Sequence, residues 1–180
     1  MWTPTIALLP GALTIYLGFD GGGYFPPATG VACAALAIAL VLRLTLAERP
    51  LEGFGLGAGL VTAALGLFAV WSLISTAWSD APARAVAEFD RSLLYILMFA
   101  LLATLPRTTQ TARIVMFGIA GGMAFVCLGG LASRVLPDVF PIAPNVLDQR
   151  LSYPITYWNG VGLLAALAIV FATHLTCSAR

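Results

Sequence analysis

Long apolar segments alternate with short polar ones along the whole chain. Six stretches carry few or no charged residues, and the segments between them are rich in proline, glycine and arginine. A helix that crosses a membrane needs about 20 mostly apolar residues. The pattern therefore predicts an all-α protein, a polytopic transmembrane helical bundle of about six spans, at approximately residues 3–19, 29–47, 55–76, 93–105, 114–136 and 157–175.

The first apolar segment, from Thr3 to Phe19, is short and contains Pro10 and Gly11, which predict an irregular helix. It has neither the basic N-terminal region nor the small-residue cleavage site of a signal peptide. We therefore expect it to be retained as a span. No linker or repeat divides the sequence, so residues 1–180 are expected to form a single transmembrane domain.

Composition excludes a soluble protein and a nucleic-acid partner. The chain is 60% hydrophobic and 9% charged, whereas about a quarter of the residues of a soluble domain are charged. Its mean hydropathy is +0.95. The formal net charge is +1, with no basic stripe to neutralise phosphates. The expected surroundings are membrane lipid.

Metal and cofactor chemistry is not expected. Cys33, Cys127 and Cys177 are scattered along apolar segments and form no CxxC pair. The lone His174 lies near the end of the last apolar segment and is interpreted as an interfacial or packed histidine, so no metal site is predicted.

The distribution of arginines between the loops gives only a weak indication of how the chain is oriented in the membrane. With the N-terminus in the cytoplasm, five lie inside, namely Arg43, Arg49, Arg107, Arg113 and Arg180, and four lie outside, namely Arg84, Arg91, Arg134 and Arg150. The loop "PRTTQTAR", residues 106–113, favours this orientation because its only charges are arginines. We expect a cytoplasmic N-terminus and an anionic ligand for the outer arginines.

The first polar cluster lies between Trp71 and Leu97. Trp71 and Trp78 are seven residues apart, so a helix would place them on one face. Asp80 and Pro82 together predict a helix start, with the carboxylate as cap and the proline in the first turn. A turn or two of amphipathic helix should then precede the fourth span.

Arg84, Glu88, Arg91 and Tyr95 follow at steps of four, three and four, which places them on one helix face. One interpretation is a set of neighbouring ion pairs that includes Asp80, each stabilising the helix by about 0.3–0.5 kcal/mol. The other is ligand binding. Arg91 favours the second interpretation, because an arginine next to an apolar run is costly unless it has a function.

The second polar cluster precedes the last apolar segment. Four prolines between Leu136 and Pro154 disfavour regular helix, and Arg150 lies in this loop. Tyr157 suits the membrane boundary, and Asn159 is expected to cap the last helix. A guanidinium beside a helix N-terminus suits a pyrophosphate. The alternative is an arginine that reaches the interface among ordinary aromatic anchors.

The run "RLSYPITYWNGVGLLAAL", residues 150–167, resembles a segment of the O-antigen ligase and polymerase superfamily, bacterial membrane proteins that join glycans from polyprenyl-pyrophosphate carriers. Arg150, Tyr157 and Asn159 match the arginine, aromatic residue and asparagine at the head of that family's apolar helix. The upstream "WSDAPARAVAEFDRSLLY" is similar to an earlier family segment with a glutamate and an arginine. The resemblance covers roughly residues 69–172.

The resemblance implies a metal-independent glycosyltransferase in the bacterial inner membrane that acts on a polyprenyl-pyrophosphate glycan. By this resemblance, the pyrophosphate would be bound by Arg150, Arg91 and Arg84, supported by Tyr157, Asn159 and Glu88. No general base is evident, although Asp138 and Asp148 lie near Arg150 in sequence. Trp158 departs from the family, which often has proline there.

Family members have more spans and a large outer loop with a histidine. The chain therefore resembles an N-terminal part, which implies the missing C-terminal half or another membrane subunit as partner. A non-catalytic subunit or relic is the second hypothesis, and small residues at 55–59 and 118–122 would allow close helix contacts with a partner or within the chain. A small transporter is less favoured, because the second, third, fifth and sixth spans are apolar inside.

Overall fold

The computed structural model describes residues 3–139 and 150–178, without the side chain of Ser178. This part of the chain contains no strand. Its six α-helices are α1 (Thr3–Phe19), α2 (Pro26–Leu46), α3 (Leu56–Ile74), α4 (Pro82–Ala103), α5 (Thr109–Val135) and α6 (Trp158–Ser178). Two short 3-10 helices are η1 (Gly21–Gly23) and η2 (Ser75–Ala77). The prediction of an all-α protein is confirmed.

Four helices of the described residues are long and apolar enough to cross a membrane: α2, α3 together with η2, α5 and α6. The helix α1 is apolar and continues through Pro10, but it has only 17 residues. The helix α4 has 22 residues, and its first half carries the charged side chains of Arg84, Glu88, Asp90 and Arg91. The helices thus support a membrane protein, and six spans stay a prediction.

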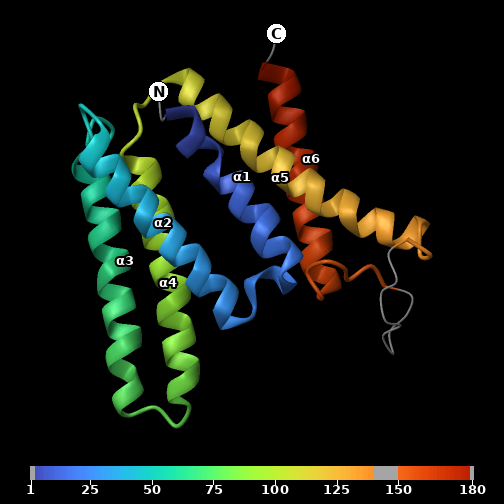
Figure 1. Cartoon of the computed structure of the whole chain (residues 1–180), viewed down its shortest axis with the longest axis horizontal. Helices are drawn as coiled ribbons and strands as arrows, with labels where there is room; N and C mark the ends of the chain where they lie inside the picture. The colour runs from blue at the N-terminus through green and yellow to red at the C-terminus, as the bar shows by residue number, and fades with distance from the viewer. Residues whose placement is uncertain (1–2, 140–149, 179–180) are drawn as a thin grey trace. The chain divides into compact units, whose positions relative to one another are not determined.

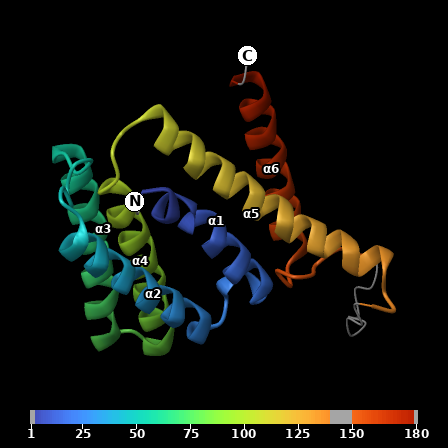
Figure 2. The ribbon, with the colours of Figure 1, turned by 45° about the horizontal axis from the view of Figure 1, so that its top comes forward.

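The chain divides into two compact units. The first unit comprises Met1–Ala7 and Pro26–Ala112, and the second comprises Leu8–Phe25 and Arg113–Arg180. Within the first unit, α4 packs against both α2 and α3 (Figures 1 and 2). Its buried core includes Leu36, Leu94 and the fully buried Leu101.

The connection between α2 and α3 is tied to the end of α4. Arg107 Nε donates a hydrogen bond of 3.1 Å to the carbonyl oxygen of Gly53. A Cβ at Gly53 would overlap the carbonyl oxygen of Leu105, so only glycine allows this close approach of two backbones. The connection between α2 and α3 and the connection between α4 and α5 are therefore held against each other.

The start of α4 agrees with the expectation in its position and differs in its cap. The helix is continuous from Pro82 to Ala103, and the expected amphipathic turns form its first part. Pro82 lies in the first turn as predicted, but Asp80 does not cap the helix, because Ala81 occupies the N-cap position without a side-chain hydrogen bond. The hydroxyl of Ser79 accepts the backbone N–H of Ala81 instead, at 3.1 Å.

In the second unit, α1 and α5 cross with their backbones in contact. A Cβ at Gly11 would overlap the backbone of Gly118, and a Cβ at Gly122 would overlap that of Gly11. Further along, Gly18 lies against Val126, so the two helices run in the same direction. The small residues at 118–122 therefore serve packing within this chain.

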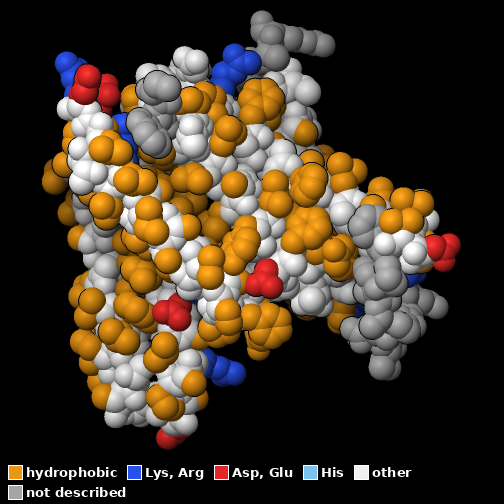
Figure 3. Space-filling view, in the orientation of Figure 1, with side chains coloured by type: hydrophobic (Ala, Val, Ile, Leu, Met, Phe, Trp, Pro, Cys, Tyr) orange, Lys and Arg blue, Asp and Glu red, His pale blue; other side chains and the backbone are white. Residues whose placement is uncertain are grey.

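Much of the apolar surface is exposed. Only 6% of the most apolar window of α6 is buried, and 17% of that of α3. Leu56 at the start of α3 is 83% exposed. Figure 3 shows apolar side chains along the helices of the first unit, with charged ones where α2 meets α3 and others toward the opposite end of these helices. Such a surface is unfavourable in water at about 25 cal/mol per Å² and favours lipid surroundings.

Candidate functional site

The segment before α6 is held against the ends of α1 and α5. The ring of Tyr153 packs edge-on against that of Phe19, with centroids 6.1 Å apart. Pro154 is buried, and the peptide bond that precedes it is cis. A Cβ at Gly130 would lie 2.7 Å from the carbonyl oxygen of Tyr153, so glycine permits this contact. The loop is thus fixed at the base of α6.

The three-glycine turn after α1 supports the same loop. The backbone φ angles of Gly21, Gly22 and Gly23 are 62°, 73° and 72°. Residues other than glycine rarely adopt such positive values. A Cβ at Gly22 would lie 2.9 Å from the Cγ2 methyl of Ile155. These glycines therefore have a structural role.

Arg150, Tyr157 and Asn159 meet around the ring of Trp158. The guanidinium carbon of Arg150 lies 4.6 Å from the centroid of the Trp158 ring, and the Tyr157 ring is 5.5 Å from it. The amide Nδ2 of Asn159 donates a 2.9 Å hydrogen bond to the Tyr157 hydroxyl. The structure therefore brings these three sequence-predicted residues together.

The donors of Arg150 point to no protein acceptor in the described part of the chain. Its side chain is exposed, and a cation–π contact uses the face of the guanidinium. The N–H groups lie in the guanidinium plane, in the fork that matches phosphate oxygens. This arginine is held in place while it keeps its capacity to bind an anion.

The expected cap by Asn159 is wrong. The helix begins at Trp158, and the backbone N–H of Val161 donates to the carbonyl oxygen of Tyr157 at 3.2 Å. Asn159 therefore lies inside the first turn, where its side chain reaches the Tyr157 hydroxyl rather than a backbone N–H. Its role is to orient an aromatic side chain.

On α4, the expected series of ion pairs reduces to one. Arg91 Nη1 lies 2.6 Å from Glu88 Oε1, and the two side chains are 34% and 50% exposed. Arg84 is exposed and forms neither an ion pair nor a hydrogen bond with any residue that the structure describes. Trp71 and Trp78 do share a face, as predicted, with ring centroids 5.8 Å apart.

The candidate residues form two clusters in different units. Arg84, Glu88 and Arg91 belong to the first unit, and Arg150, Tyr157 and Asn159 belong to the second. Each cluster is built from its own helix start. Binding of one ligand by both clusters stays a prediction.

Other polar candidates stand apart from Arg150. Asp138 is exposed after α5, and Asp148 lies outside the described residues. His174 is exposed on α6. Within residues 3–139 and 150–178, no three side chains of histidine, cysteine, aspartate or glutamate come close enough to hold a metal ion.

Two features were missed in the sequence. Trp158 was considered as a departure from the family pattern, yet it is the direct partner of Arg150. A polar cavity near Arg43 was not anticipated, although the dense charges at residues 43–52 are a signal for it.

Comparison with known proteins identifies no relative: no family model, no curated protein and no solved structure matches this chain. The resemblance to O-antigen ligases therefore rests on the quoted residues alone.

Proposed function

We propose that this chain is a polytopic protein of the bacterial inner membrane that takes part in glycan transfer from a polyprenyl-pyrophosphate carrier. In this proposal the N-terminus is cytoplasmic, and all six helices span the membrane. The reaction is metal-independent transfer to an acceptor hydroxyl, as in O-antigen ligases and polymerases. The transfer would use this chain together with a C-terminal half or another membrane subunit.

One observation carries the proposal: the Arg150 guanidinium lies on the Trp158 ring at 4.6 Å, at the head of the apolar helix α6. A cation on an aromatic face is oriented without a carboxylate that would neutralise it. The pyrophosphate of a lipid carrier lies at the same membrane boundary as this arginine in the proposed topology. Positive charge there binds the carrier and stabilises the leaving diphosphate as its charge develops.

Arg91 and Arg84 have a supporting role in the proposal. Glu88 holds Arg91 by a 2.6 Å ion pair on an exposed helix face, which orients the guanidinium at little energetic cost. Arg84 lies two turns before it and is exposed. Both arginines are on the outer side in the proposed topology, as Arg150 is.

The test measures binding of a polyprenyl pyrophosphate to the purified chain in lipid nanodiscs. Arg150→Ala is expected to weaken binding about 10- to 100-fold, the loss expected for charge-assisted hydrogen bonds. Arg150→Lys should lose nearly as much, because lysine lacks the planar fork. Arg113→Ala, an exposed arginine at the start of α5, is the matched control.

Unchanged binding in Arg150→Ala and in Arg91→Ala, with normal membrane levels, would remove the assignment. A non-catalytic subunit is the second candidate, and the exposed apolar surface of α6 favours it. It predicts that crosslinks from Leu163, which is 63% exposed, capture a protein subunit while glycan transfer by the assembled complex does not depend on Arg150.

A further inference from the structure

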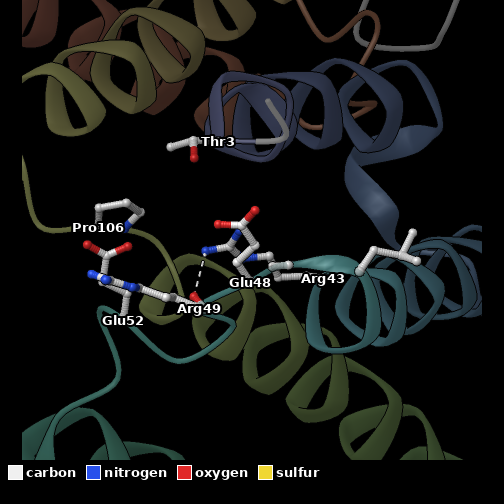
Figure 4. A pocket seen from close by; sticks show the side chains of 8 residues that line it. Thr3, Arg43, Glu48, Arg49, Glu52 and Pro106 are labelled. Atoms are coloured by element: carbon white, nitrogen blue, oxygen red, sulfur yellow. Dashed lines mark hydrogen bonds between the residues drawn. The ribbon is translucent and has the colours of Figure 1, made fainter.

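A polar cavity of about 390 Å³ lies within the first unit, where α2 ends and α3 begins. Its lining includes Thr3, Arg43, Glu48, Arg49, Glu52 and Pro106 (Figure 4). The charged residues come from the end of α2 and the connection that follows it. A cavity at the end of an apolar helix lies at the depth where a span leaves the hydrocarbon and lipid headgroups begin.

Arg43 is fixed at the cavity by one of its nitrogens. Its Nη2 donates to the carbonyl oxygens of Thr104, at 3.2 Å, and of Arg49, at 3.5 Å. Its Nε is buried and has no hydrogen-bond partner among the described residues. Since Nε is covered by protein atoms, a ligand in the cavity would reach this guanidinium through Nη1, which has no hydrogen-bond partner among the described residues.

The other charges around the cavity are unpaired. Glu48, Arg49 and Glu52 are exposed. Among the residues that the structure describes, the one salt bridge joins Glu88 and Arg91, at the other end of α4 from this cavity. Two arginines and two glutamates therefore share one small cavity without neutralising each other in pairs.

We propose that this cavity binds the headgroup of a zwitterionic phospholipid that carries a primary amine. The phosphate is bound by Arg43 and Arg49, and the ammonium by Glu48 and Glu52. An ammonium group has three N–H donors for carboxylates, whereas a trimethylammonium group has none. Leu46, which also lines the cavity and is 58% exposed, offers apolar surface for the acyl chain.

The proposal depends on the helices lying in a membrane and not on glycan transfer. It is tested with the whole chain in nanodiscs that hold phosphatidylethanolamine, phosphatidylcholine and phosphatidylglycerol in equal amounts. Native mass spectrometry then counts the lipids retained on the released protein. Phosphatidylethanolamine should be retained about three- to fivefold more than phosphatidylcholine, the effect of one or two partly exposed ion pairs.

Glu48→Gln combined with Glu52→Gln should abolish this preference, and Arg49→Gln should lower retention of every phospholipid. These exposed side chains are preferred to Arg43, whose loss would also remove the bond to Thr104. Asp80→Asn, an exposed carboxylate before α4, is the control and should leave the preference unchanged. Circular dichroism checks that each variant is folded.

Three results would overturn the proposal. Equal retention of the ethanolamine and choline lipids would show that the carboxylates recognise no amine. Preferred retention of phosphatidylglycerol would show an anion site. Release of the bound lipid by excess inorganic phosphate would identify free phosphate as the ligand.

Discussion

Arg150 is oriented by the face of an aromatic ring rather than by a carboxylate. Trp158 provides this support at 4.6 Å, and its own ring is flanked by that of Tyr157 at 5.5 Å. By contrast, Arg91 lies 2.6 Å from Glu88, which offsets its charge. The two arginines therefore differ in how much of their charge is available to an anion.

We predict that Trp158→Leu weakens binding of polyprenyl pyrophosphate about threefold, because an exposed cation–π contact contributes about 0.5–1 kcal/mol. Trp158→Phe should retain most of the affinity, since it keeps an aromatic face. The measurement is the nanodisc binding titration used for Arg150, and Trp78→Leu is the matched tryptophan control. Equal affinity in the leucine and phenylalanine variants would show that the ring does not orient Arg150.

At the residue scale, the sequence predicted which residues lie together before α6. It did not predict the contacts that these residues make. Arg150, Tyr157 and Asn159 were expected to share a site because they flank one helix start. The expected cap by Asn159 depended on where the helix begins, and the helix begins at Trp158, so the capping position falls on Tyr157, two residues earlier. The contact of Arg150 with the Trp158 ring depends on the conformation of the loop before α6. Secondary-structure propensities do not specify that conformation.

At the scale of elements, helix existence followed from hydropathy, and the close crossing of α1 and α5 followed from glycines. The prediction of a helix at residues 3–19 matches α1. The start of α4 at Pro82 was predicted from Asp80 and Pro82, whereas hydropathy alone placed the apolar span from about residue 93. Hydropathy marks where charges end, whereas a helix continues through charged residues as readily as through apolar ones.

The crossing of α1 and α5 gives a matched test of neighbouring glycines. Gly122→Ala places a methyl group against the backbone of Gly11 and should destabilise the protein by about 1–3 kcal/mol, as overpacking does. Gly121→Ala meets nothing within 4 Å and should be neutral or stabilise α5 by about 0.5–1 kcal/mol. Thermal unfolding in detergent, followed by circular dichroism, measures both.

Equal stability of these two alanine variants would contradict the backbone contact. A compensating substitution at Gly11 cannot relieve the overlap, because a side chain there would itself meet the backbone of Gly118. The comparison of positions 121 and 122 is the sharper one, since both are glycines within α5 and only Gly122 is buried.

At the scale of the whole molecule, α1 and α4 decide the number of spans. At 1.5 Å per residue, the 22 residues of α4 extend about 33 Å and the 17 of α1 about 25 Å. A hydrocarbon core is about 30 Å thick, so α4 is long enough and α1 is close to the lower limit. The charges of α4 lie in its first half, where long arginine side chains can reach the headgroups.

Six spans with a cytoplasmic N-terminus predict alternating accessibility of three positions. Cysteines introduced at Asp80 and Ser152 should react with a membrane-impermeant maleimide from outside intact cells. A cysteine at Gln110 should react only after the membrane is opened. The background variant has alanine in place of the native cysteines, Cys33, Cys127 and Cys177.

Each other topology gives a different labelling pattern. If only α2, α3, α5 and α6 cross and the N-terminus stays cytoplasmic, position 80 becomes internal while 110 stays internal and 152 external. If all six helices cross with the N-terminus outside, all three positions reverse. Internal labelling at Ser152 would place Arg150 in the cytoplasm, away from an outward-facing lipid pyrophosphate, and the proposed glycan transfer would lose its site.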